Sequence, residues 1–335
     1  MGRRWNQEEA KRLFERLRQE YDVYAPRLFE GTGCFSDTDV VRYGTVDSFE
    51  EIVWDKKSDY SFKEALLPIS ETIMYFTENS TSIPEEPRKR LIFLRSCELN
   101  ALERLDEIYL RNGAEDFYYK RIRENAKFIL MGCEKSFDSC FCVSMGTNKC
   151  KGSHAYAHRN QETLYLDITD AELARCTEGL CAEEVSENVR WVQKNDIKVE
   201  IPRELPPDIA GHEIWKTYGS RCIGCGRCNF VCPTCTCFTM QDIFYQDNEN
   251  AGERRRVWAS CQVDGYTDMA GGMSFRKSQG ERLRFKVLHK VQDYKKRFGA
   301  QMCVGCGRCE QICPEYISYT ACLNKLSKLE GRIPE

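Results

Sequence analysis

The chain has 335 residues, of which 41% are hydrophobic and 30% charged, and its formal net charge is −3. This length is enough for two domains with buried cores. The small net charge gives no sign of binding to nucleic acid or to a membrane surface. No apolar run approaches the roughly 18 residues of a membrane span, and the N-terminus lacks the apolar segment of a signal peptide. We therefore expect a cytoplasmic protein.

The 20 cysteines are the unusual feature of the composition. Thiols stay reduced in the cytoplasm, and disulfide scaffolds are typical of short secreted chains, so disulfides do not explain this number. Metal ligation and redox chemistry are the remaining uses.

The first two hundred residues carry the pattern of an α/β domain. Asn6, with Glu9 three residues later, predicts a helix start, and apolar residues at helical spacing continue to Tyr21. The apolar run 91–94 predicts a buried strand, followed by a helix that ends near Gly113. A second helix over 117–124 leads into another apolar run, 128–131. Strand, helix and strand in this order indicate a parallel βαβ unit, so we assign residues 1–200 to an α/β domain.

Residues 201–211 contain three prolines and are typical of a linker. Beyond them, residues 222–233 and 303–314 form an internal repeat, CIGCGRCNFVCP and CVGCGRCEQICP. The insert between the repeats is partly helical, with Leu283, Val287, Val291, Tyr294 and Phe298 on one face. Basic residues occupy largely other positions, which predicts a solvated face, with a docking surface as the alternative: Arg282, Arg284, Lys286, Lys290 and Lys296. We expect residues 212–335 to form an α-helical ferredoxin-like domain.

Each repeat has the spacing C-x2-C-x2-C-x3-C-P, which is the bacterial ferredoxin motif for [4Fe–4S] clusters. In that motif the fourth cysteine binds the neighbouring cluster. We therefore assign Cys222, Cys225, Cys228 and Cys313 to one cluster, and Cys303, Cys306, Cys309 and Cys232 to the other. Zinc sites pair two close ligands with two distant ones and would leave half of each run unexplained. Two adjacent clusters with no open ligand position indicate electron transfer rather than catalysis.

Four cysteines upstream of the runs are candidate ligands of a third cluster. Cys97 and Cys133 each follow a predicted strand, and parallel strands would bring both to one sheet edge; Cys140 and Cys142 come a short loop later. The alternative is that these four are buried packing residues, and Cys34 and Cys150 are possible replacement ligands. We expect Cys235, Cys237 and Cys261 to pack near the clusters, and His154 and His158 to form a surface pair on a helix.

Nucleotide-binding fingerprints are missing from the sequence. Gly31-Thr32-Gly33 lacks the third glycine of a dinucleotide motif, and no Walker loop is present. We therefore expect flavin, nicotinamide and nucleotide to be bound by another subunit.

Longer strings indicate a family. FCVSMGTNKC (141–150), CPTCTCF (232–238), RSCELNALERLD (95–106), and RRRVWASC, DMAGGMSFR and GERLR between the two runs resemble anaerobic sulfite reductase A subunits. The strings FSDTD (35–39) and PISET (68–72) fit as well. The β subunits of soluble nickel–iron hydrogenases share the CFC-x-SMG and WxSC…AGG…FR patterns and are the main alternative.

The resemblance implies an electron-transfer subunit of an NADH-dependent sulfite reductase. A flavin subunit would oxidise NADH, this chain would pass single electrons onward, and a sirohaem subunit would reduce sulfite to sulfide. The alternatives are a relay in a hydrogenase-type complex, a self-contained reductase using Cys97, Cys133, Cys140 and Cys142, and a zinc-dependent binding module. The charge balance and the two ferredoxin runs disfavour the last of these.

Overall fold

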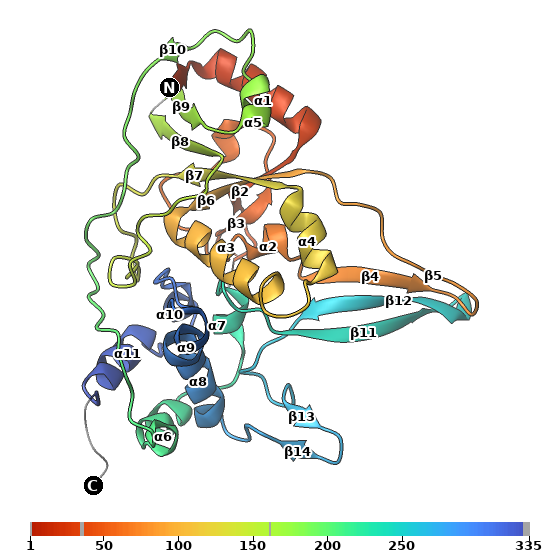
Figure 1. Ribbon diagram of the computed structural model, residues 1–335, viewed down its shortest axis with the longest axis vertical. Helices are drawn as coiled ribbons and strands as arrows, with labels where there is room; N and C mark the ends of the chain where they lie inside the picture. The colour runs from red at the N-terminus through yellow and green to blue at the C-terminus, as the bar shows by residue number, and fades with distance from the viewer. Residues whose placement is uncertain (1, 34–36, 161, 331–335) are drawn as a thin grey trace. The chain divides into compact units, whose positions relative to one another are not determined.

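The computed structural model describes residues 2–33, 37–160 and 162–330 (Figure 1). It divides into two compact units, each built from three stretches of chain. The first comprises 1–68, 85–137 and 148–193, and the second comprises 69–84, 138–147 and 194–335. The second unit thus contains two short stretches from before residue 194, because each pairs with residues of 252–258 or 304–307.

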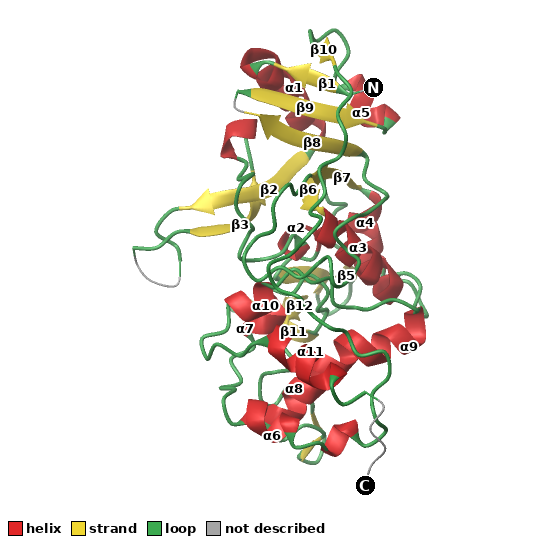
Figure 2. Ribbon diagram, turned by 90° about the vertical axis from the view of Figure 1, so that its left-hand side faces the viewer, coloured by secondary structure: helices red, strands yellow, loops and turns green. Residues whose placement is uncertain are grey.

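The first unit is built on an eight-stranded mixed sheet, best followed in Figure 2, with strand order β10-β1-β9-β8-β7-β6-β2-β3. Its strands are β1 (Arg3–Trp5), β2 (Asp22–Phe29), β3 (Val40–Thr45), β6 (Arg90–Arg95), β7 (Ala126–Met131), β8 (Ala155–Asn160), β9 (Thr163–Ile168) and β10 (Glu183–Glu184). Its helices are α1 (Gln7–Glu20), η1 (Phe49–Glu51), α2 (Lys63–Leu66), α3 (Ser96–Tyr109), α4 (Phe117–Glu124) and α5 (Ala171–Arg175).

The predicted βαβ unit is confirmed. β6 and β7 pair in parallel, in register from Arg90 opposite Ala126 to Arg95 opposite Met131, and α3 and α4 connect them. β6 is almost entirely buried because helices and loops cover both faces of a parallel sheet.

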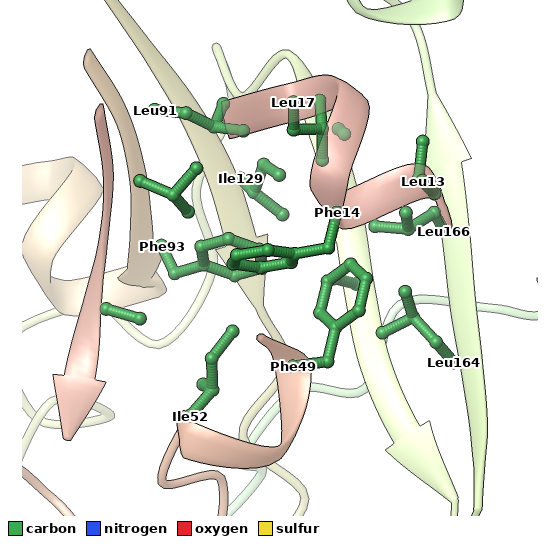
Figure 3. Packing of buried hydrophobic residues seen from close by; sticks show 14 of the residues in the cluster. Leu13, Phe14, Leu17, Phe49, Ile52, Leu91, Phe93, Ile129, Leu164 and Leu166 are labelled. Carbon is green, nitrogen blue, oxygen red and sulfur yellow. The ribbon is translucent and has the colours of Figure 1, made fainter. Parts of the chain in front are cut away.

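Helix α1 begins where the sequence predicts. The Asn6 side chain accepts a hydrogen bond from the Glu9 backbone N–H at 2.9 Å, which satisfies a free donor of the first turn. The apolar face of the helix packs on the sheet, and Phe14 meets Phe49 edge to face with ring centroids 4.6 Å apart (Figure 3). This cluster is the core of the first unit.

The second unit combines helices with an antiparallel sheet. The sheet has the order β11-β12-β4-β5, and a separate hairpin joins β13 and β14. The strands are β4 (Ser70–Phe76), β5 (Thr81–Ser82), β11 (Phe238–Tyr245), β12 (Asn248–Trp258), β13 (Asp268–Met269) and β14 (Met273–Ser274). The helices are η2 (Ile209–Gly211), α6 (Ile214–Gly219), α7 (Arg227–Phe230), α8 (Gln279–Leu288), the π-helical η3 (His289–Asp293), α9 (Tyr294–Phe298), α10 (Arg308–Gln311) and α11 (Tyr319–Ser327).

The prediction of a helical ferredoxin-like domain is therefore confirmed in part. The helical insert is present as α8, η3 and α9, which run on continuously (Figure 1). No pattern in the sequence predicts the four-stranded sheet. Within the described chain, no helix has the length and apolar character needed to span a membrane.

Candidate iron–sulfur site

The two cysteine runs adopt the same local structure. In each, a glycine in the left-handed region starts a short helix that carries the third cysteine: Gly226 (φ 76°) before α7 and Gly307 (φ 69°) before α10. Only glycine adopts this conformation without strain. The short helix turns the chain so that cysteines close in sequence can face one point.

Two cavities gather the eight cysteines of the runs. The first is lined by Cys222, Cys225, Cys228 and Cys313, together with Cys309. The second is lined by Cys232, Cys303, Cys306 and Cys309. The fourth cysteine of each run therefore lies at the cavity of the other run. This is the grouping that the ferredoxin spacing predicts, and it supports the ligand assignment proposed below.

The surroundings of both cavities suit an anionic iron–sulfur cluster. Lys286 and Tyr319 line both cavities. The Tyr319 hydroxyl is buried and has no hydrogen-bond partner among the described residues. A hydrogen-bond donor and a cation beside four thiols match the sulfide and thiolate acceptors of a cluster. The residues present therefore fit [4Fe–4S] clusters.

The two runs differ in how they are covered. Ile223, after the first cysteine of the first run, is 60% exposed, whereas the equivalent Val304 is 2% exposed. Residues 138–147 cover the second run: the Phe141 N–H donates to the Gly305 carbonyl at 2.8 Å, and Thr147 Oγ1 donates to the Val304 carbonyl at 2.7 Å. A side chain at Gly305 would collide with the backbone of this loop. The first run is thus the more exposed of the two, and its second cysteine, Cys225, is exposed whereas the equivalent Cys306 is buried.

The four cysteines of the predicted third cluster belong to different units. Cys97 and Cys133 follow the ends of the parallel strands β6 and β7 in the first unit, as predicted. Arg95 Nη1 donates to Cys133 Sγ at 3.5 Å, and Arg95 Nη2 donates to the backbone carbonyls of Trp54 and Lys56. Cys140 and Cys142 lie in the second unit, on the loop that covers the second run.

The loop cysteines are anchored by neighbours in their own unit. The Cys140 thiol donates to the Cys306 carbonyl at 3.7 Å, and Cys142 Sγ accepts from Asn195 Nδ2 at 3.6 Å. Of the replacement ligands, Cys150 lies in the first unit, where burial raises the pKa of its thiol to about 12. Cys34 lies outside the described residues.

Cys235, Cys237 and Cys261 lie beside the first run, as anticipated. Cys235 and Cys261 are buried and Cys237 is half-buried. Asn229, next to Cys228, donates to Cys261 Sγ at 3.0 Å. A hydrogen bond between Cys237 and Cys261 lowers the pKa of Cys237 to about 6, against the opposite effect of burial.

The prediction of a surface histidine pair on a helix is wrong. His158 is a buried residue of strand β8, and His154 immediately precedes that strand. His158 Nε2 lies 2.9 Å from a carboxylate oxygen of Glu187, and the His158 ring packs at a tilt against Tyr165 with ring centroids 4.9 Å apart. His154 Nδ1 accepts the backbone N–H of Phe128 at 3.0 Å. Both histidines are structural, because each has a fixed partner within the sheet.

The prediction of a solvated basic face on the insert helix is also wrong for three of its residues. Arg282, Lys286 and Lys290 are 5%, 4% and 3% exposed. Arg282 reaches Asp264 at 2.6 Å. The lysines instead face cysteines of the two runs. Burial alone would lower the pKa of Lys286, but the neighbouring charges of Cys228 and Cys309 raise it well above its usual value. Three of the five basic residues that could form a docking surface on this helix are therefore buried.

Comparison with known proteins places this site in context. Residues 221–317 match the family of 4Fe–4S dicluster domains. The chain is 26% identical over 336 residues to sulfhydrogenase 2 subunit beta of Pyrococcus furiosus, a match that covers 94% of this chain and 95% of the relative. No solved structure matches.

These matches support an iron–sulfur electron-transfer subunit with 4Fe–4S clusters in its C-terminal dicluster domain. They do not support the sulfite reductase assignment. The relative fits the hydrogenase-type alternative better, because it is itself a sulfhydrogenase subunit.

Proposed function

We propose that this chain is the electron-transfer β subunit of a multi-subunit complex of the sulfhydrogenase type. In this proposal Cys222, Cys225, Cys228 and Cys313 bind one [4Fe–4S] cluster, and Cys232, Cys303, Cys306 and Cys309 bind a second. The observation that carries it is the crossed lining of the two cavities, each drawing cysteines from both runs. Each cluster, when bound, supplies a carrier for one electron.

The arrangement of the cavities supports a relay. Cys309, Lys286 and Tyr319 line both, so the two binding sites share a wall. The chain encloses the second site with residues 138–147 and leaves Ile223 exposed at the first. We infer that a partner subunit exchanges electrons at the first site, where little protein separates the thiols from solvent.

The proposed partner subunits rest on two observations, the absence of nucleotide-binding motifs from the sequence and the similarity to a sulfhydrogenase subunit. No dinucleotide fingerprint or Walker loop is present in the sequence, so a separate flavin subunit is proposed to exchange electrons with NADH. A nickel–iron subunit is the proposed partner at the other end of the electron path, because the relative is a sulfhydrogenase subunit. A sirohaem subunit that reduces sulfite is the second candidate partner, because the sequence segments in 141–150 and 254–284 resemble anaerobic sulfite reductase A subunits.

The deciding experiment is anaerobic purification of the tagged chain from its own host, with the metals and cofactors of the co-purifying subunits measured. Stoichiometric nickel, together with reduction of the chain's clusters by hydrogen gas, is the expected result. Sirohaem with sulfite turnover would instead establish the sulfite reductase assignment. Sulfite turnover by the isolated chain with a chemical reductant would overturn both, in favour of a self-contained reductase.

A further inference from the structure

Lys286 and Lys290 are buried cations that have no carboxylate partner among the described residues. They lie on α8 and η3, and no described aspartate or glutamate forms an ion pair with either. The Lys290 ammonium donates to Thr234 Oγ1 at 2.8 Å and lies 3.4 Å from Met302 Sδ. Burying an ammonium is strongly unfavourable unless an anion lies close by. A negative charge other than a carboxylate must therefore lie near these two ammonium groups.

The positions of the two lysines identify that charge. Lys286 lines both cysteine cavities, whereas Lys290 lines the second only. The groups that act most strongly on Lys286 are thiols from both runs, Cys228 and Cys309. Cys232 acts most strongly on Lys290. Lys286 is thus shared by the two sites, and Lys290 belongs to one.

The effect of such a charge on a bound cluster has a definite sign. A [4Fe–4S] cluster with four thiolates is anionic and becomes more so when it accepts an electron. A buried cation stabilises the more negative state more strongly, because charges interact with little screening in the protein interior. Removing the cation therefore makes reduction less favourable.

We propose that Lys286 is the common counter-charge of both clusters and raises both reduction potentials, while Lys290 raises that of the second cluster alone. This rests on the proposed binding of two clusters by the eight cysteines of the runs. Both lysines are positioning residues that bring the reduction potentials of the two clusters close together. An electron can then pass between the clusters without a large change in free energy. Tyr319 adds to both sites a buried hydroxyl that has no hydrogen-bond partner in the described part of the chain.

The test is an EPR-monitored redox titration of the full chain with its clusters. We expect Lys286→Met to lower the equilibrium constant for reduction at least tenfold at both clusters, which corresponds to about 59 mV toward negative potential. Lys290→Met should shift one cluster only, and Tyr319→Phe should shift both by less. Lys286→Arg should keep the parent potentials, as should the control Lys296→Met, which removes an exposed charge from α9.

Unchanged potentials in a fully loaded Lys286→Met chain would overturn the proposal. If Lys286→Met loses iron, Lys286→Arg decides: retention of iron by the arginine variant supports a counter-charge, and equal loss overturns it in favour of packing. Iron and acid-labile sulfide in the parent chain are measured separately. A parent chain with less iron than two clusters need would contradict the proposed ligands, which is distinct from a failure of the lysine proposal.

Discussion

The ammonium group of Lys290 donates a hydrogen bond to Thr234 Oγ1 over 2.8 Å, and Thr234 lies two residues after Cys232. The backbone of the same lysine serves the other run, since its carbonyl accepts the N–H groups of Met302 at 3.0 Å and Cys303 at 3.3 Å. Lys290 lies in the π-helical η3, where the usual helical hydrogen bonds are interrupted. One residue of the insert helix therefore fixes the end of the first run and the start of the second.

Replacing Thr234 by valine tests this link. The variant keeps the side-chain volume but removes the oxygen acceptor of a buried ammonium, at a cost of about 1.5–3 kcal/mol. We expect iron to be lost to a chelator at least about tenfold faster than from the parent, followed anaerobically by the visible absorbance of the clusters. Thr217→Val, at an exposed site on α6, is the matched control. Equal rates for the two variants would show that the bond does not stabilise the second site.

Crossed ligation can be tested with paired double variants. Cys222→Ala with Cys313→Ala removes two ligands of one proposed cluster, so the chain should keep about four iron atoms of about eight. Cys303→Ala with Cys313→Ala removes one ligand from each and should leave almost none. Uncrossed ligation predicts the opposite order for the same two variants. Cys322→Ala, at a buried cysteine of α11 that lines neither cavity, should keep the full iron content.

Much of the site could be predicted because its chemistry is local. The spacing of Cys222, Cys225 and Cys228 imposes a tight curl of the chain, and the structure has that curl. The βαβ unit follows in the same way from short apolar runs such as 91–94. These features depend on neighbours in sequence.

The missed features depend on neighbours in space. Lys286 and Lys290 were expected at a solvated face because lysine is rarely buried, and the cysteines that surround them come from two runs far apart in the sequence. Strand β4 joins the second unit through its pairing with β12, from Gly252 opposite Phe76 to Val257 opposite Ser70. No periodicity in 70–76 indicates a partner so far along the chain. Functional sites are where local patterns are expected to fail.

The upstream cysteines are tested by the iron content of the purified chain. Cys97 and Cys133 lie in one unit and Cys140 and Cys142 in the other, so within either unit these four predicted ligands supply only two of the four thiols of a cubane. We expect about eight iron atoms per chain, unchanged in Cys97→Ala and Cys133→Ala. About twelve in the parent, with about eight in either variant, would instead establish a third cluster with these ligands.

The first unit should lose stability in mild acid through His154. Burial lowers the pKa of this histidine, and the charge of Lys127 lowers it further, with Asp170 opposing and Arg123 assisting. The unfolded chain binds the proton with a pKa of about 6.5. The contribution of neutral His154 to the free energy of unfolding is therefore complete above that pH. It is lost as the pH falls toward the lower pKa of the folded state. Protonation of Nδ1 also removes the acceptor of the Phe128 N–H.

Hydrogen exchange of a peptide spanning β7 measures this effect. We expect protection of the Phe128 amide, corrected for the intrinsic rate, to fall between about pH 7 and pH 5. His154→Gln keeps an acceptor that does not titrate and should make protection independent of pH. His158→Gln keeps His154, so its β7 peptide should behave as in the parent. A pH-dependent loss that persists in His154→Gln would assign the effect to another group.

The unequal cover of the two runs should make the clusters unequal in their resistance to oxidation. Ile223 is 60% exposed and Val304 only 2%, so oxidants reach the first site more easily. We expect limited ferricyanide to remove about four iron atoms at least about tenfold faster than the rest. In Cys232→Ala, which lacks a ligand of the second site, only the fast phase should remain, and in Cys313→Ala only the slow one. A single rate in the parent, or the reverse pattern in the variants, would mean that the loop 138–147 does not protect the second site.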